Sequence, residues 1–194
     1  MFQQAMKKGR RPGRSDTREA ILAAARRQFA EHGYDGTTMR AVAAEAGVDV
    51  ALGHYYFGSK RELFAAALAL PVNPADAIAS VIDQGPDGLG ERLVRLLLQV
   101  WDDPQTGAPL RAIVRSIESE APLLRGFVER EIVPRLAETI PGPDATLRAA
   151  GAGTQLMGLI FARYVIELEP IASAGHDELV ALVAPSLQRY FDAG

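Results

Sequence analysis

A short segment in the first third of the chain combines polar and aromatic side chains at a spacing that suits contact with a nucleic-acid duplex. Thr37, Asp49 and Ser59 each stand where a helix is expected to begin, so each can accept a hydrogen bond from a free helix amide. His54 and Lys60 can donate to phosphate oxygens. The chemistry expected of this segment is therefore binding through hydrogen bonds and charge.

Two short helices around a glycine turn would position these groups. Apolar residues recur at helical spacing after Thr37, the expected N-cap, and Gly47 follows the last of them, where glycine adopts a left-handed turn at little cost. A second helix is expected over residues 48–56, with Val48, Leu52 and Phe57 on its core side. The pattern predicts a helix-turn-helix whose second helix enters the major groove of DNA.

Ser59 to Glu62 form a capping box that opens a third helix and carries Lys60 at its positive end, a natural place to bind phosphate. Asp49 can cap the second helix or accept from a cytosine amino group, and its position before a helix favours the cap. His54 suits a phosphate contact and an ordinary surface histidine equally well. Gly53 indicates a close approach of the backbone to DNA or to the first helix.

Charge is divided unevenly along the chain, although its formal net charge is only -3. Residues 1–64 hold 11 basic and 7 acidic side chains, whereas residues 65–194 hold 10 and 17. The first residues form a basic stretch without acidic residues, which predicts a disordered arm that contacts a minor groove or flanking phosphates; the alternative is a solvated tail. The side chains expected to contact DNA are Arg10, Arg11, Arg14, Thr37, Thr38, Asp49, Val50, Ala51, His54, Tyr55, Tyr56 and Lys60.

Residues 16–64 resemble the N-terminal domain of the TetR family of transcriptional regulators. The residues that carry this resemblance are Ile21 to Ala25, Phe29 to Tyr34, Thr37-Thr38, Ala46 to Val48, Tyr56-Phe57 and Ser59-Lys60. The chain departs from the family pattern at Asp49, Leu52, Gly53 and His54, which bears on base preference. The resemblance implies a repressor that binds a palindromic operator as a homodimer and releases it when a small effector binds.

Length and pattern predict an all-α protein with a basic arm (1–15), a helix-turn-helix domain (16–70) and a helical ligand-binding and dimerisation domain (71–194). The chain has no cysteine, no signal peptide is recognised, and Arg163 breaks the best apolar run, so a cytoplasmic protein without a membrane span is expected. The third helix is expected to continue through Ala69. Further helices are expected over residues 74–84, 88–102, 108–119, 121–139, 144–169 and 175–191.

The last two helices are expected to join two copies of the chain. The 144–169 helix is apolar on more than one face and carries Gly151, Gly153 and Gly158, which let another helix approach closely. The final helix has a similar apolar pattern. The alternative is that both faces belong to the core of a single subunit.

The helical body is expected to hold a small-molecule effector, and no cofactor or metal is predicted. Large or polar side chains on the body helices are expected to line the effector site, although such residues are more often plain core. The expected lining residues are Trp101, Arg115, Phe127, Met157 and Phe161. The competing hypotheses are a helical protein-interaction module without DNA binding and, least favoured, an enzyme, since His32, His54 and His176 show no metal-ligand spacing.

Overall fold

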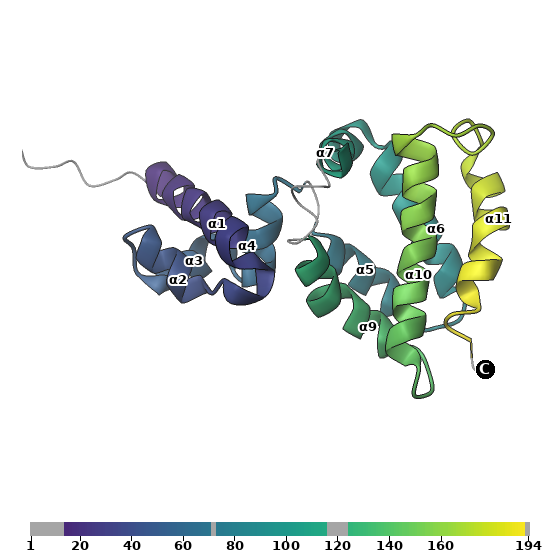
Figure 1. The fold of residues 1–194 in the computed structure, drawn as a ribbon, viewed down its shortest axis with the longest axis horizontal. Helices are drawn as coiled ribbons and strands as arrows, with labels where there is room; N and C mark the ends of the chain where they lie inside the picture. The colour runs from purple at the N-terminus through teal and green to yellow at the C-terminus, as the bar shows by residue number, and fades with distance from the viewer. Residues whose placement is uncertain (1–13, 71–72, 116–123, 193–194) are drawn as a thin grey trace, which may run out of the picture.

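The computed structural model describes residues 14–70, 73–115 and 124–192, and within them every regular element is a helix. Figure 1 shows two lobes, which we call the reader (residues 14–70) and the body (residues 73–192). This confirms the predicted all-α fold. The reader contains α1 (Arg14–Gly36), α2 (Met39–Glu45), α3 (Val50–Phe57) and α4 (Lys60–Ala67). The body contains α5 (Pro74–Ile82), α6 (Leu89–Asp102), α7 (Pro104–Arg115), η1 (Val128–Ile132), α9 (Val133–Ala137), α10 (Ala145–Ile160), η2 (Phe161–Val165) and α11 (His176–Gln188).

Helix α1 is the support on which the other reader helices pack. It begins at Arg14, two residues before residue 16, the predicted start of the helix-turn-helix domain. It buries Ile21 and Phe29 against α2 and α4. Its regular backbone breaks at Gly33, whose φ of 70° suits glycine. The break lets Tyr34 turn back into the reader core, where its side chain is only 3% exposed.

The start of α2 corrects one residue of the sequence prediction. Thr38, not Thr37, is the N-cap, since its hydroxyl accepts a hydrogen bond from the Ala41 amide at 3.1 Å. Thr37 is 1% exposed and donates its hydroxyl to the Gly33 carbonyl at 2.8 Å. The break in α1 exposes this carbonyl as an acceptor, so the Thr37 side chain points into the reader. Thr38 is then the residue that caps α2.

The turn and the two caps that follow it agree with the sequence prediction, although α3 begins at Val50, two residues after the predicted residue 48. Gly47 has a φ of 69°, the left-handed conformation expected after α2. Asp49 caps α3, accepting from the Ala51 amide at 2.7 Å, and the capping box of Ser59 and Glu62 opens α4. Helix α4 ends at Ala67 and does not continue through Ala69, whose φ is 54°.

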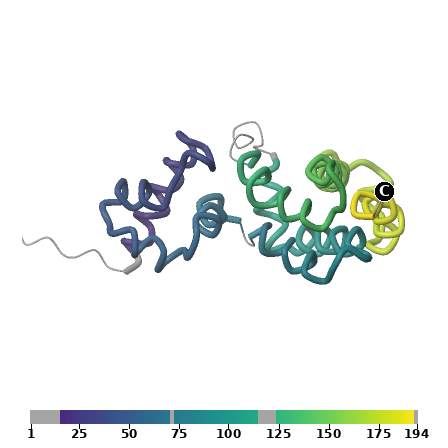
Figure 2. Tube along the Cα trace, turned by 90° about the horizontal axis from the view of Figure 1, so that it is seen from below, coloured from purple at the N-terminus to yellow at the C-terminus, as the bar shows by residue number. Residues whose placement is uncertain are grey.

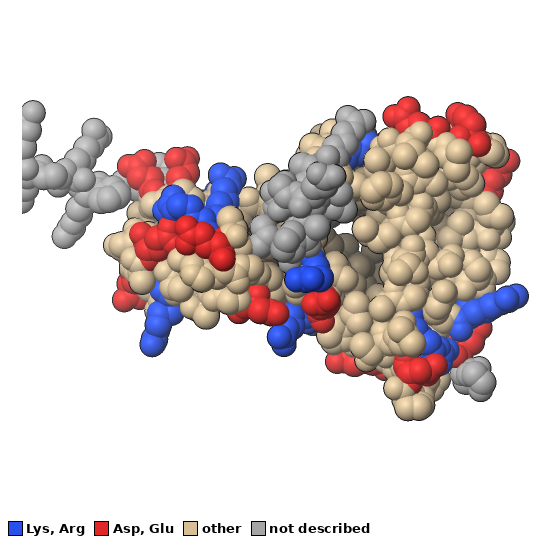
Figure 3. All heavy atoms as spheres, viewed as in Figure 1, with Lys and Arg blue, Asp and Glu red and all other residues tan. Residues whose placement is uncertain are grey.

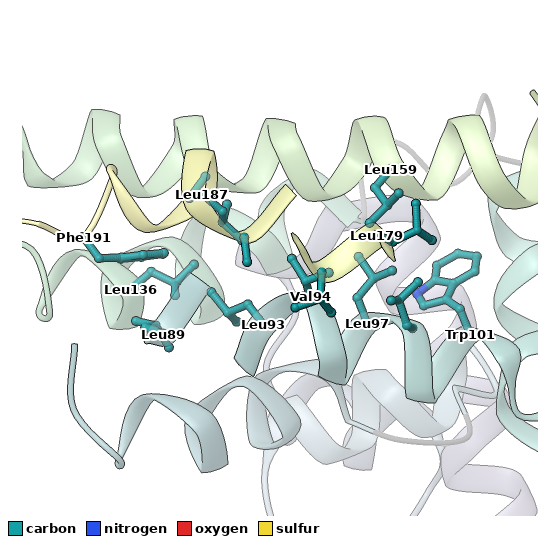
Figure 4. Close-up of a cluster of buried hydrophobic side chains, with 14 of the residues drawn as sticks. Leu89, Leu93, Val94, Leu97, Trp101, Leu136, Leu159, Leu179, Leu187 and Phe191 are labelled. Carbon is teal, nitrogen blue, oxygen red and sulfur yellow. The ribbon is translucent and has the colours of Figure 1, made fainter. Parts of the chain in front are cut away.

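The body is held by an aliphatic core between α6, α10 and α11. Helix α6 carries a strong apolar stripe and packs along α11. Figure 4 shows Val94 and Leu97 of α6 directed toward Leu159 of α10 and Leu179 of α11. Figures 1 and 2 place α11 at the end of the molecule farthest from the reader.

Most body helices differ from their predicted bounds, and α5 and α11 end at Ile82 and Gln188, before the predicted residues 84 and 191. Helix α7 begins at Pro104 because proline is favoured in the first helical turn, where its missing N–H costs nothing. The expected 121–139 helix changes to a π-helix, η1, just before Pro134, which cannot donate to the usual carbonyl one turn back. Helix α10 likewise passes into a second π-helix, η2, and ends at Val165, earlier than the predicted residue 169.

Candidate nucleic-acid interface

Helix α3 presents one side to solvent and packs the other against the reader. Gly53 and Phe57 are buried, whereas Ala51, His54 and Tyr55 are exposed, the tyrosine by 62%. A Cβ on Gly53 would lie 3.3 Å from the Cε of Met39, so this glycine allows α3 to lie close to α2. The exposed side is the one that a major groove could receive, as the sequence predicts.

Leu52 lies on this exposed side, contrary to the prediction that it belongs to the core. It is 37% exposed, while Val48, before the helix, packs partly against the reader core. Gly53 and Phe57 occupy the inward positions, four residues apart, so Leu52 is turned to the edge of the helix. An apolar side chain here suits contact with a thymine methyl group.

The His54 ring has a defined hydrogen-bond partner. Its Nδ1 lies 2.8 Å from the Gly58 carbonyl oxygen, an acceptor, so Nδ1 must carry the proton. In the neutral ring Nε2 is then an acceptor, and it donates to a phosphate only when the ring is protonated. The hydrogen bond thus fixes the orientation of the imidazole at the carboxyl end of α3.

Several other predicted contact residues lie elsewhere. Thr37 is buried, and Tyr56 is partly buried against the reader core with its ring 5.1 Å from that of Tyr55. Val50 is half-buried and Thr38 is exposed. Arg10 and Arg11 lie outside the described residues, as does the side chain of Arg14, although its backbone opens α1.

Lys60 turns away from the exposed side of α3 and toward the body. Its Nζ lies 4.4 Å from the centre of the Tyr34 ring, a cation–π contact. Burial lowers the pKa of Lys60, although the nearby carboxylates of Asp35 and Glu131 oppose this shift.

Arg40 is a further candidate DNA contact, which the sequence analysis does not include. It is exposed on α2 and makes no ion pair within the described ranges. Its position two residues after the Thr38 cap, at the start of α2, is the sequence feature that could have indicated it.

A cluster of aromatic rings connects the reader to the body. Phe127, predicted to line an effector cavity, instead packs 4.9 Å from the Phe64 ring and 5.5 Å from the Tyr34 ring. It is 2% exposed and belongs to the reader core, since these two reader rings form the site that receives it. We call Tyr34, Phe64 and Phe127 the aromatic joint.

Polar contacts surround the aromatic joint. The Tyr34 hydroxyl donates to Glu131 of η1 at 2.6 Å. Burial and this hydrogen bond raise the pKa of Tyr34. Arg61 of α4 pairs with Asp76 of α5 at 2.8 Å and with Glu131 at 3.8 Å. Reader and body therefore meet through one buried ring and a small number of charged groups.

The remaining predicted effector residues whose side chains are described lie in different surroundings. Trp101 is buried in the body core and stacks on Tyr164 at 5.2 Å. Met157 and Phe161 are 47% and 38% exposed, on the outer side of α10 and η2. The side chain of Arg115 lies outside the described part of the chain. Apolar type alone did not distinguish a lining residue from one on an outer surface.

The outer side of α10 and the first residue of η2 form an exposed stripe with almost no charge. Its members recur at alternating spacings of three and four, the pattern of a helix-packing seam. They are Leu147, Ala150, Thr154, Met157 and Phe161, all exposed. Figure 3 shows this face with charged side chains confined to its upper and lower ends. We call these five residues the α10 seam.

The architecture defines a class of protein: a helix-turn-helix DNA-binding regulator with a helical body. The family model described as bacterial regulatory proteins, tetR family, matches residues 21–67. The model described as the C-terminal domain of tetracyclin repressor-like proteins matches residues 87–191. The HTH-type transcriptional regulator BetI of Agrobacterium fabrum is 31% identical over 185 residues, covering 90% of this chain and 86% of the relative.

The HTH-type transcriptional repressor AcnR of Corynebacterium glutamicum is 34% identical over 91 residues, covering 47% of this chain and 44% of that protein. The crystal structure of a TetR-family regulator from Streptomyces coelicolor A3 has 41% sequence identity and a TM-score of 0.50, covering 95% of this chain and 99% of the other. The chain belongs to the TetR family of DNA-binding transcriptional regulators. The resemblance expected from the sequence is confirmed.

None of the helices in the described ranges is long and apolar enough to cross a membrane. Within the same residues, no cluster of histidine and carboxylate side chains has the arrangement of a metal site.

Proposed function

We propose that this regulator binds a palindromic operator as a homodimer, represses transcription, and releases DNA when a small effector occupies its body. The observation that carries the proposal is the exposed side of α3, held by the Asp49 cap and by the close approach of Gly53 to α2. A twofold pair of such helices would read two half-sites about one DNA turn apart. Acting on DNA in this way, the protein would work in the cytoplasm.

The proposed base and phosphate contacts come from the exposed residues of α3 and from the start of α2. Ala51 and Tyr55 would face base edges or the sugar-phosphate backbone, and His54 would approach a phosphate. Thr38 and Arg40 would contact the sugar-phosphate backbone beside these residues. Arg10, Arg11 and Arg14 remain proposed arm contacts, whereas Thr37 is left out because its side chain is buried.

The proposed dimer interface is formed by the α10 seam and the exposed side of α11. Leu182 of α11 is 64% exposed, and Leu147 of α10 is 76% exposed. A Cβ on Gly153 or Gly158 would meet no atom within 4 Å, so a partner helix can approach α10 there. Covering these apolar side chains with a second copy would remove them from water.

The proposed effector site lies in the body, beside the Trp101–Tyr164 stack. A cavity of about 470 Å³ is lined by Asp102, Arg111, Arg163, Tyr164, Glu167, Glu169, Ala172 and Ser173. Its volume is within the range of small-molecule sites. An effector bound here releases DNA only if it binds the released state more tightly than the DNA-bound state.

A gel-shift titration with DNA from beside its own gene tests the proposal. We expect dimeric, salt-sensitive and sequence-selective binding, which Tyr55→Ala weakens by about tenfold or more. Tyr55→Phe keeps the ring and removes only the hydroxyl. Comparing the two variants therefore distinguishes the contribution of the hydroxyl from that of the ring. Absence of binding to any such duplex at modest salt would favour the alternative of a helical protein-interaction module.

A further inference from the structure

A second cavity, of about 410 Å³, lies where the reader meets the body. It is lined from both lobes, by Tyr34, Asp35, Ser59, Lys60, Arg61, Arg130 and Glu131. Figure 3 shows side chains of both charge signs gathered where the two lobes meet. This cavity is distinct from the proposed effector site, which lies beyond the carboxyl end of α6.

The lining carries three cationic side chains and two carboxylates, and all but one of these groups have a partner of opposite charge. Arg130 pairs with Asp35 at 2.9 Å, and Arg61 lies 3.8 Å from Glu131. Glu131 also accepts the Tyr34 hydroxyl. Within the described ranges, Lys60 has no carboxylate within 4 Å. Arg61 also pairs with Asp76, outside the lining, at 2.8 Å, so in the described part of the chain Lys60 is the cation of the lining without an ion-pair partner.

The surroundings of Lys60 favour an added negative charge. Its ammonium group lies over the Tyr34 ring, and burial has removed part of its water. An anion beside it would replace that lost hydration with a charge-assisted hydrogen bond. Arg130 lies on the opposite lobe and can supply a second donor without leaving Asp35, because a guanidinium has five N–H groups.

We infer that this cavity is a binding site for a small phosphate or carboxylate anion, held by Lys60 of the reader and Arg130 of the body. Its volume admits a small metabolite and lies near the lower end of the range for ligand sites. Because its lining comes from both lobes, an occupant ties α4 to η1. The site needs no operator, so it stands or falls separately from DNA binding.

Calorimetric titration of the full-length protein with inorganic phosphate, at constant ionic strength and without DNA, tests the inference. We expect wild type to bind phosphate with a dissociation constant of about 1 mM or lower, corresponding to a few charge-assisted hydrogen bonds. Lys60→Gln should weaken binding by about tenfold or more, whereas Lys60→Arg should retain it. Acetate titrated in parallel identifies the class: the tighter of the two probes names the occupant as a phosphate or a carboxylate.

For a second variant we expect the phosphate affinity to change in the opposite direction. Asp35→Asn removes a lining carboxylate and frees Arg130, so phosphate should bind more tightly than to wild type. Arg189→Gln, which removes an exposed cation from the far end of the body, is the matched control and should bind as wild type does. Cooperative thermal unfolding of each variant would confirm that it is folded.

Equal phosphate binding by wild type and Lys60→Gln would overturn the inference, as would no binding at about 20 mM phosphate, well above the expected constant. A third contrary outcome is that Lys60→Gln leaves phosphate binding unchanged but lowers the salt slope of operator binding by about one unit. That result would make Lys60 a contact to DNA phosphate. Absence of operator binding by wild type contradicts the proposed function and leaves the anion titration unaffected.

Discussion

The reader and the body are stabilised in different ways. The reader consists of one long helix and three short ones, and a side-chain cap fixes the start of each short helix. Its core is built around aromatic rings. The body has longer amphipathic helices and a mainly aliphatic core, and it leaves the α10 seam uncovered. Local signals thus define the reader, whereas long-range packing defines the body. The two lobes meet at the aromatic joint, so substitutions there test how far the stability of the protein depends on their contact.

The largest effect is expected from Phe127→Ala. Removing this buried ring leaves a cavity between Phe64 and Tyr34, which should lower the free energy of unfolding by about 3–5 kcal/mol. Chemical denaturation followed by circular dichroism measures the loss. Phe127→Leu, which keeps much of the volume, should cost clearly less. If Phe127→Ala is as stable as wild type, the ring does not join the two lobes.

The next effect concerns the uncovered side of the body. Met157→Arg places a charge in the centre of the α10 seam, so we expect the dimer to dissociate about 100-fold more readily, in keeping with the cost of an unpaired interfacial charge. Sedimentation velocity across a concentration series measures this change. Gln155→Arg, on the flank of the same helix, is the matched control and should remain dimeric. Dissociation of both variants to the same degree would show that the effect is not specific to the seam.

Residues whose environment is local were predicted well from the sequence. Asp49 and Ser59 cap their helices because the acceptor and the amides that it satisfies lie two or three residues apart. Thr37 and Thr38 were harder to tell apart, since both fit a cap. The carbonyl that draws Thr37 inward is available only because α1 breaks at Gly33.

Residues whose environment depends on distant segments could not be assigned from the sequence. Phe127 lies on a helix of the body, and nothing beside it in the chain indicates that its partners are Tyr34 and Phe64, more than sixty positions away. Met157 and Phe161 have the residue types of a cavity lining, but their direction depends on which side of α10 the body core occupies. Periodicity gives the faces of a helix and does not say which face is covered within one subunit.

A smaller effect is expected from Tyr34→Phe. The variant keeps the ring in the aromatic joint but removes the hydrogen bond to Glu131, so we expect a loss of about 1 kcal/mol in the free energy of unfolding. Tyr190→Phe is the matched control, since its hydroxyl makes no hydrogen bond within the described part of the chain. Denaturation curves of the two variants should differ. Identical curves would mean that the Tyr34 hydroxyl does not help to join the lobes.

The smallest effect lies within the body and depends on pH. Burial would raise the pKa of Asp102, but the hydrogen bond from His176 at 2.6 Å, together with Tyr164 and with Arg163 at 3.3 Å, outweighs burial and lowers the pKa. A carboxyl whose pKa is lowered by folding stabilises the protein above its unfolded pKa and loses that contribution as the pH falls through the folded value. Because the site is partly exposed to solvent, the contribution should be only about 0.5–1 kcal/mol. Asp102→Asn should therefore have a lower melting temperature than wild type at neutral pH. The difference between the two melting temperatures should become smaller below about pH 4. Thermal melts at neutral and acid pH measure that difference, and a difference that widens in acid would contradict the assignment.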